Sequence, residues 1–296
     1  MSASVAVDAR ALRHPAPGRS RARWTGTAVW VLVSAMVVVL FASPLVAVLL
    51  GSLKTRAEAA AVPPSYLPRT LSPDSYTALW ASDAGVGRSI LNSLVVALAA
   101  VALTVVLALL AAYGFHRYPF PGSGALFVLL LAAIMVPFQV LVTPMYVVLD
   151  ALRLTNSLVG LVLVVTTFQL PFATFVIRNS FAAIPPELYE AASVDGAGMW
   201  SSLRMLLPLL RAGLITAGLF AFFAAWNEFF AALILLADQD RFTLPVILTT
   251  LVSGARGAVD WGLLQSGVVV TILPCLVIFV VLQKYYVSGL VAGSGK

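Results

Sequence analysis

The residues of this chain best suited to a chemical task form a short polar segment between two strongly apolar runs. The segment reads Glu190-Ala191-Ala192-Ser193-Val194-Asp195-Gly196-Ala197 and is followed by Leu206-Leu207-Pro208. Its carboxylates offer polar contacts, and its small side chains let another chain approach closely. Such a segment favours a docking element for a partner protein over a plain connector.

Catalytic and metal chemistry find little support in the sequence. Cys275 is the only cysteine, which excludes an intrachain disulfide and a cysteine cluster. The two histidines, His14 and His116, lie in basic flanking segments, so we expect no metal site. A phosphate-binding loop of the form G-x-x-x-x-G-K-S/T is missing, because the glycine-rich tail has Leu290 where glycine is required. We therefore expect no catalytic residue and no ATP hydrolysis by such a loop.

The composition places most of the chain in lipid. Hydrophobic residues make up 61% of the 296 residues and charged residues 10%, against about 45–50% and about 25% in soluble domains. Backbone polar groups in hydrocarbon must be bonded within the protein, so the apolar runs must be helices. A β-barrel would need short alternating segments, which the sequence lacks. The sequence predicts an all-α membrane protein.

Six runs are long enough to cross a bilayer, which takes roughly 20 apolar residues per helix. We expect spans at about 28–52, 89–114, 124–149, 157–181, 205–236 and 262–286. Residues 1–27 form a basic N-terminal tail, and residues 28–296 form one transmembrane domain. Kinks are expected at Pro137, Pro144, Pro171 and Pro274.

Basic residues set the expected orientation, because they are enriched in the cytoplasmic loops of membrane proteins. With the N-terminus inside, the larger share of the 18 Lys and Arg residues is cytoplasmic. Both termini and the polar loop at about 182–204 are then cytoplasmic, while 54–88 and 237–261 are outer loops. The basic balance of the chain thus reflects orientation rather than nucleic-acid binding.

The cytoplasmic loop is predicted to hold a short helix. Pro185-Pro186 ends the fourth span and suits the first turn of a new helix, where Glu187 meets the positive end of the helix dipole. Gly196 is placed to end that helix in a left-handed turn. On composition alone, the alternative is an interfacial connector that only matches the headgroup layer.

The spacing beyond this helix resembles the permease subunits of bacterial ABC importers. Their signature loop has Glu-Ala-Ala, three residues, Gly, nine or ten residues, and then a hydrophobic residue with Pro. This chain has Glu190-Ala191-Ala192, Gly196 and Leu207-Pro208. Asp195-Gly196-Ala197 is similar to the carbohydrate branch, in particular to the maltose-type second permease. Further segments that resemble this branch are Asn92-Ser93, Ala112-Tyr113-Gly114-Phe115, Trp226-Asn227-Glu228-Phe229, Thr243-Leu244-Pro245, Asp260-Trp261-Gly262 and residues 283–289.

The resemblance implies the type I ABC importer permease fold, with about six transmembrane helices, and a sugar-transport subunit that is not an enzyme. It implies three protein partners: a second homologous permease, two copies of a cytoplasmic ATPase and an extracytoplasmic solute-binding protein. The ATPase binds the ATP, so this chain needs no cofactor. In the docking loop, Glu190 is then the polar contact. The remaining motif residues are Ala191, Ala192, Asp195, Gly196 and Pro208.

Polar residues inside the apolar runs are the candidates for the solute pathway. Asn227 and Glu228 lie well within the fifth run, where ionisable groups usually face a bundle interior or a water-filled cavity. Gln139 and Gln169 offer uncharged donors and acceptors for sugar hydroxyls. The alternatives are hydrogen bonds to neighbouring helices, or an interfacial position anchored by Trp226.

Two other functions stay open at this stage. The closer one is an ABC permease for amino acids, peptides or phosphate. The more distant one is a stand-alone ion-coupled carrier. Such carriers place several ionisable groups in their helices, whereas this chain has essentially Glu228 alone and carries a docking loop that a carrier does not need.

Overall fold

The computed structural model describes residues 20–82, 84–118, 120–188, 196, 198–252 and 259–294, and side chains between Thr27 and Gln283. These residues form helices and turns with no strand, which confirms the predicted all-α class. The chain divides into two units, residues 1–48 and 49–296. The short elements are α2 (Arg56–Ala59), α3 (Asp74–Ala81), η2 (Gln239–Arg241) and α11 (Leu244–Val252).

Helix α1 (Ser20–Ser52) supplies the described part of the first unit and is apolar on every side from Thr27 to Val48. Its large side chains are exposed in this part of the helix; Trp30 is 74% exposed and Phe41 73%. A long helix that is hydrophobic all round is a membrane span. The helix begins at Ser20, inside the segment 1–27 expected as a tail.

Five helices within the described residues are long and apolar enough to cross a membrane. They are α1, α4 (Val86–Arg117), α7 (Leu158–Ala182), α9 (Met199–Trp226) and α12 (Trp261–Ser294). The expected third span is instead a bent pair: α5 (Ser123–Ala132) with η1 (Ala133–Met135), then α6 (Phe138–Ala151), at 103°. Pro137 precedes α6 in extended conformation, so the bend falls where a kink was predicted.

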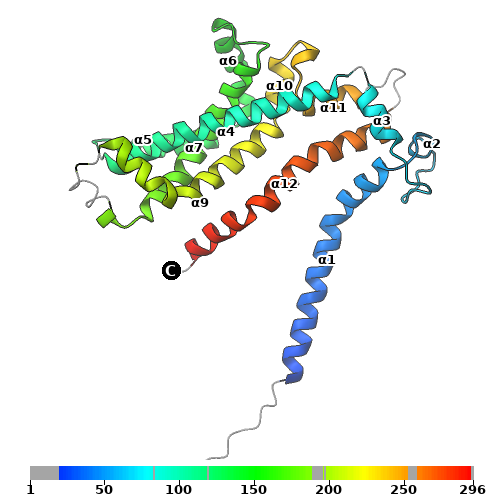
Figure 1. The fold of residues 1–296 in the computed structure, drawn as a ribbon, viewed down its shortest axis with the longest axis horizontal. Helices are drawn as coiled ribbons and strands as arrows, with labels where there is room; N and C mark the ends of the chain where they lie inside the picture. The colour runs from blue at the N-terminus through cyan, green and yellow to red at the C-terminus, as the bar shows by residue number, and fades with distance from the viewer. Residues whose placement is uncertain are drawn as a thin grey trace, which may run out of the picture. The chain divides into compact units, whose positions relative to one another are not determined.

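Helices α4, α7 and α9 pack side by side and form the centre of the second unit (Figure 1). Small side chains recur along one face of α4 every three or four residues and are buried; they are Ser89, Ser93, Ala97, Ala100, Thr104, Ala108 and Ala112. Small residues at this spacing let membrane helices approach closely. On α9, Gly213 serves the same purpose, because an added Cβ would lie 2.0 Å from Ser180 Oγ of α7.

Helices α4 and α7 run parallel to each other. Near their C-terminal ends, the rings of Tyr113 and Phe181 lie 5.7 Å apart. At their N-terminal ends, Asn92 and Asn156 both bond the same segment, residues 237–242. Two parallel helices joined by one connection require that connection to cross back once. The bent pair α5–α6 therefore counts as one span, which brings the candidate spans among the described residues to six.

This group of helices has two opposite ends, the loop face and the docking-loop face. The loop face comprises the N-terminal ends of α4 and α7 and the C-terminal end of α9, with the segments 53–82 and 236–243. The docking-loop face comprises the C-terminal ends of α4 and α7 and the N-terminal end of α9. Each face has its own apolar core, one around Trp226 and Leu244 and one around Tyr113 and Phe181.

The expected fifth run, 205–236, is corrected in two respects. Its helix α9 begins earlier, at Met199, so Pro208 lies in the helix interior rather than near its start. The helix also ends at Trp226, and after a break at residues 227–229 a short helix, α10 (Phe230–Leu235), follows. The polar residues expected inside one long span therefore lie at a break between two helices.

Candidate functional site

The docking loop begins as the sequence predicts. Helix α7 ends at Ala182, and residues 186–188 are helical directly after Pro185, with Leu188 N–H donating to Pro185 O at 3.2 Å. Ile184 anchors this entry, since it is only 8% exposed and packs in the core of the docking-loop face. Four of the predicted docking residues, namely Glu190, Ala191, Ala192 and Asp195, lie outside the described residues.

Gly196 adopts the left-handed conformation that the sequence predicts, with φ of +69°. No atom lies within 4 Å of the position that a Cβ would take there, so the requirement for glycine is conformational rather than steric. Gly198 follows with φ of −68° and ψ of 173° and precedes α9. The two glycines therefore differ in backbone conformation, although neither has another atom within 4 Å of its Cβ position.

The end of α9 and the break at residues 227–229 are tied to α12 by polar contacts. Trp226 Nε1 donates to Thr271 O of α12 at 2.9 Å, and the Trp226 ring stacks on Phe222 with centroids 5.8 Å apart. Asn227 Nδ2 donates to Phe223 O at 2.8 Å and contacts Cys275 Sγ at 3.9 Å. Trp226 is only 2% exposed, so the interpretation of Trp226 as an interfacial anchor is wrong.

Glu228 lies two residues before the short helix α10. Its Oε1 accepts a hydrogen bond from the backbone N–H of Ala231 at 2.7 Å, three residues on. This satisfies one of the N–H groups that a helix leaves without an internal partner at its N-terminal end. The carboxylate therefore has a structural task at the break.

A small polar-ended cavity lies beside this break. It has a volume of about 180 Å³ and is lined by Phe138, Val164, Val165, Phe168, Gln169, Ala224 and Glu228. Gln169 comes from α7 and Glu228 from the break, so the structure brings these two predicted pathway residues together. The rings of Phe138 and Phe168 meet edge to face at 4.7 Å and form the aromatic wall. Gln139 is exposed, and neither it nor Asn227 belongs to this lining.

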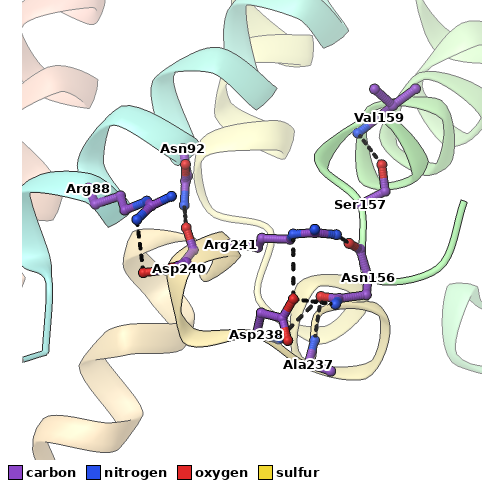
Figure 2. A network of polar contacts seen from close by, with 9 residues as sticks. All are labelled: Arg88, Asn92, Asn156, Ser157, Val159, Ala237, Asp238, Asp240 and Arg241. Atoms are coloured by element: carbon purple, nitrogen blue, oxygen red, sulfur yellow. Dashed lines mark hydrogen bonds and ion pairs between the residues drawn. The ribbon is translucent and has the colours of Figure 1, made fainter.

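A polar network joins three distant segments on the loop face (Figure 2). Asn156 Oδ1 accepts from the N–H groups of Ala237 and Asp238, and its Nδ2 donates to Asp238 Oδ2 at 2.7 Å. Arg241 donates to the Asn156 carbonyl oxygen. Asn156 has φ of +49°, a conformation that asparagine tolerates better than most residues. The segment 237–241 is thus fixed to the turn that precedes α7.

The same segment is also fixed to α4. Arg88 pairs with Asp240 at 2.9 Å, and Asn92 Nδ2 donates to the carbonyl oxygens of Asp240 and Phe242 at 2.9 and 3.0 Å. Ser93 Oγ accepts from Leu244 N–H, the first residue of α11. Two sequence motifs that were recognised separately, Asn92-Ser93 and Thr243-Leu244-Pro245, therefore form one contact.

A further ion pair joins α2 to the start of α12 on this face. Arg56 lies 2.9 Å from Asp260, and Leu263 N–H donates to Asp260 Oδ1 at 3.0 Å. Burial alone would raise the pKa of the Asp260 carboxyl, but the hydrogen bonds from Arg56 and Leu263 hold that pKa below its ordinary value. Asp260 is therefore charged at neutral pH and links α2 to the start of α12.

Sequence reasoning missed several of these residues. Phe138 and Phe168 were not predicted. Each directly precedes a candidate glutamine, Gln139 or Gln169, and this neighbour in the sequence could have pointed to it. Asn156 was also missed; its signal was an asparagine directly before Ser157, the residue that caps α7. Each was one polar or aromatic residue among many in the sequence, and the fold alone brings them into contact.

Residues 104–290 match the protein family described as "Binding-protein-dependent transport system inner membrane component". This range is more than half of the chain. The chain belongs to this family.

Named relatives of this permease are similar over most of its length. It is 32% identical to the diacetylchitobiose uptake system permease protein NgcG of Streptomyces coelicolor, over 85% of this chain and 83% of that protein. It is 33% identical to the arabinooligosaccharides transport system permease protein AraQ of Bacillus subtilis, over 88% and 92%. The chain is therefore a multi-pass permease of an ABC transporter.

A solved structure supports the fold of the permease. A chain of a bacterial ABC transporter involved in the import of the acidic polysaccharide alginate matches with a TM-score of 0.79, over 92% of this permease and 100% of that chain. The two are 18% identical, so this likeness shows the fold alone. The predicted ABC importer permease fold is confirmed. The family match at residues 104–290 contains both the docking loop and the break beside the cavity.

Proposed function

We propose that this permease moves a sugar or oligosaccharide across the cytoplasmic membrane in an importer driven by a separate ATPase. The observation that carries the proposal is the carbohydrate cargo that several of its relatives' names give. Their names specify diacetylchitobiose, arabino-oligosaccharides and, for the Rhizobium meliloti relative, alpha-glucosides. The matched solved transporter imports a polysaccharide. Amino acids, peptides and phosphate do not occur among these cargoes.

The cavity beside the break supports a carbohydrate cargo. The Gln169 amide supplies donors and an acceptor for hydroxyl groups without a net charge, and Glu228 adds acceptor oxygens. The Phe138 and Phe168 rings supply an apolar wall for the less polar faces of a sugar ring. We propose that Gln169 and Glu228 line part of the solute pathway, and that Asn227 and Gln139 act outside this cavity.

The ion-coupled carrier is the weaker alternative. It would need Glu228 to take up and release protons during transport. The bond from Ala231 N–H to Glu228 Oε1 gives this carboxylate a helix-capping role that needs no transport of protons. That role favours a permease whose energy comes from a partner subunit.

The proposed assembly has the partners that the resemblance implies. A second homologous permease completes the pathway, two ATPase copies bind the ATP, and a solute-binding protein delivers the cargo. The related alginate transporter was solved in complex with a periplasmic protein that holds an alginate pentasaccharide. This permease itself needs no cofactor and performs no catalysis in the proposal.

The proposed orientation places the docking-loop face in the cytoplasm. Six crossings put both termini on one side of the membrane, and the excess of Lys and Arg assigns that side to the cytoplasm. The loop face is then extracytoplasmic, within reach of a binding protein. In the docking loop, Glu190 is the polar contact with the ATPase, and Ala191, Ala192 and Gly196 permit close packing.

The test measures uptake by the complete transporter reconstituted in liposomes, with ATP present on the side of the membrane that carries the ATPase subunits. Labelled diacetylchitobiose and arabino-oligosaccharides are compared with labelled glutamine and phosphate. We expect ATP-dependent uptake of a carbohydrate only. Uptake of glutamine or phosphate instead would overturn the cargo class, and uptake without ATP would overturn the importer.

Docking is tested in the same assay with Gly196→Glu. The larger, charged side chain in a left-handed position should leave an inserted permease that no longer couples to the ATPase, with uptake lost. Gly198→Ala is the matched control, because Gly198 has an ordinary backbone conformation and open space around it. Normal uptake in Gly196→Glu would contradict the docking assignment.

Gln169 is tested against Gln139 as its matched control. Both are glutamines of apolar spans, but only Gln169 lines the cavity. Gln169→Ala should raise the sugar concentration needed for half-maximal uptake, and Gln139→Ala should leave it unchanged. Equal effects of both substitutions would remove the cavity from the pathway.

A further inference from the structure

The connection between α2 and α3 contains a segment whose exposed side chains are mostly apolar. This segment, residues 62–71, reads Val-Pro-Pro-Ser-Tyr-Leu-Pro-Arg-Thr-Leu and is called the apolar loop below. Val62 is 93% exposed and Tyr66 92%, and Leu67 and Leu71 are exposed as well. Large apolar side chains in water cost free energy, so several of them together mark a contact with a membrane or with another protein.

The charged side chains next to the apolar loop are bonded to the loop itself. Lys54 is only 9% exposed, and its Nζ donates to the carbonyl oxygen of Ser65. The Glu58 carboxylate accepts from Ser65 Oγ at 2.9 Å and from Arg69 N–H at 3.0 Å. Charged groups thus hold the loop in shape, while its apolar side chains project outward. A loop that only meets water has the opposite arrangement, with its charges outside.

Bonds to the end of a membrane span fix the position of the apolar loop. Helix α1 is a candidate span from Thr27 to Ser52. Ser72 N–H donates to the carbonyl oxygen of Leu53 at 2.8 Å, and Lys54 holds the middle of the loop at Ser65. The loop is therefore bonded to the two residues that directly follow the span. It lies at the depth where α1 leaves the apolar layer.

Two exposed tryptophans lie on the neighbouring elements. Trp80 belongs to α3 and Trp261 is the first residue of α12, and both are more than half exposed. The two elements pack together (Figure 1), since a Cβ on Gly262 would lie 2.5 Å from Ser75 Oγ. Tryptophan and tyrosine gather at the level of the lipid headgroups because their rings are apolar and their N–H or O–H groups are polar. The aromatic residues of this face therefore suit a membrane interface.

The backbone of the apolar loop suits the headgroup layer and excludes the hydrocarbon core. Irregular backbone is not tolerated against lipid within the core, because its polar groups would lack partners. Three of the ten residues are prolines, which have no N–H group, and the N–H of Arg69 is bonded to Glu58. Arg69 is the one charged residue of the loop sequence, and its sign matches lipid phosphates. The loop can therefore enter the boundary between headgroups and acyl chains.

We propose that the apolar loop is an interfacial anchor, whose exposed apolar side chains insert into the lipid leaflet on the loop-face side. Insertion by about 5–10 Å covers such side chains. The bonds to Leu53 and Lys54 favour lipid over a protein partner, because they keep the loop beside the end of α1. The proposal depends on membrane insertion alone. It is independent of the sugar cargo and of ATPase docking, so it fails separately from them.

The test is electron paramagnetic resonance of the transporter complex in liposomes, with a spin label on Leu67→Cys in a Cys275→Ser background. The same complex without Leu67→Cys is the blank for labels on other subunits. Oxygen concentrates in lipid and a nickel chelate in water, so the ratio of their collision rates with the label reports immersion. We expect this ratio at residue 67 to exceed that at Gln239→Cys by about threefold or more. Gln239 is the matched control, exposed in a polar segment of the same face.

A second position and a lipid control keep the test decisive. Tyr66→Cys repeats the measurement if Leu67→Cys does not assemble, and Phe41→Cys on the exposed surface of α1 gives the ratio in lipid. Two results overturn the proposal: equal ratios at residues 67 and 239, or a label at residue 67 that is in water until the solute-binding protein is added and then becomes shielded. The second result would assign the apolar loop to the binding protein.

Discussion

The loop face and the docking-loop face hold the same helices together by different means. On the loop face, polar side chains bridge segments far apart in the sequence, as Asn156 does with residues 237–238 and Arg56 with Asp260. On the docking-loop face, the contacts are mainly aromatic, with Tyr113 against Phe181 and Arg178 above Phe127. The first face is therefore joined by polar contacts between distant segments, whereas the described contacts of the second face are mainly between aromatic rings and one arginine.

This difference separates stability from function. A network that is complete within the chain contributes to folding whether or not partners are present. Gly196, by contrast, lies in the loop for which we propose ATPase docking, and a Cβ there would meet no other atom within 4 Å. Substitutions on the loop face should therefore act on unfolding, and substitutions on the docking-loop face should act on transport.

The largest effect is expected from Asn156→Ala. It removes three side-chain hydrogen bonds and places alanine at a positive φ, so we expect a loss of about 2–3 kcal/mol in the free energy of unfolding. Denaturant unfolding in mixed micelles measures this. Asn156→Gly tolerates the positive φ and reports the share of the hydrogen bonds alone. An unchanged unfolding midpoint in Asn156→Ala would show that the network does not stabilise the loop face.

Gly160→Ala should come next. Its Cβ would lie 2.2 Å from the backbone oxygen of Leu154, which cannot move without disturbing the turn before α7. We expect a loss of about 1–3 kcal/mol. Gly114, near the docking-loop end of α4, has no atom within 4 Å of its Cβ position, so Gly114→Ala should be neutral or stabilise by up to about 1 kcal/mol. If both variants lose the same stability, the two faces do not differ in packing.

Gly196→Ala sharpens the comparison at the other face. Alanine in the left-handed conformation costs about 1–2 kcal/mol, which lowers the population of the native loop conformation by a factor of roughly 5–30. We expect slower ATP-driven uptake with an unchanged unfolding midpoint, and Gly198→Ala should behave as wild type. A shifted midpoint with normal uptake would reverse the assignment of this face to function.

The smallest effect concerns the Arg56–Asp260 pair and pH. The pKa of Asp260 is lower in the folded protein than in the unfolded chain, where it is about 3.9. The stabilisation is therefore present above pH of about 4 and is lost as the pH falls through the lower, folded pKa. Both side chains meet solvent, so the pair is worth less than about 1 kcal/mol. Asp260→Asn should therefore reduce the fall in melting temperature at acidic pH. An unchanged fall would show that the pair does not contribute to the pH dependence of stability.

Much of the fold could be predicted from the sequence because lipid imposes strong rules. Apolar runs of sufficient length must be helices, which located α4 and α7 within a few residues and the start of α12 within one, although α12 continues to Ser294 beyond the predicted residue 286. Proline chemistry located the bend at Pro137 and the end of α7 before Pro185. The left-handed turn at Gly196 followed from the usual place of glycine after a helix.

The remaining features depend on which helices are neighbours, which one sequence does not specify. A break at Asn227 is invisible to a hydropathy reading because apolar residues continue to Leu235. Trp226 suits an interface and a core equally until its bond to Thr271 is known. Gln169 and Glu228 could each be predicted as candidates, but the cavity that they share could not. They are 59 positions apart in the chain and meet only through packing.

The parallel packing of α4 and α7 has a consequence for biosynthesis. Helix α4 enters the membrane before α5, α6 and α7 have been made, so its stripe of small residues faces lipid in the meantime. The stripe includes the hydroxyl of Ser93 and that of Thr104, which has no hydrogen-bond partner among the described residues. Helix α7 ends at Ala182, 65 residues after the end of α4 at Arg117, so assembly of this pair must wait for some seconds of translation at about 5–20 residues per second. The newly inserted helix α4 is therefore the stage at which this permease most needs a membrane insertase or chaperone to shield it.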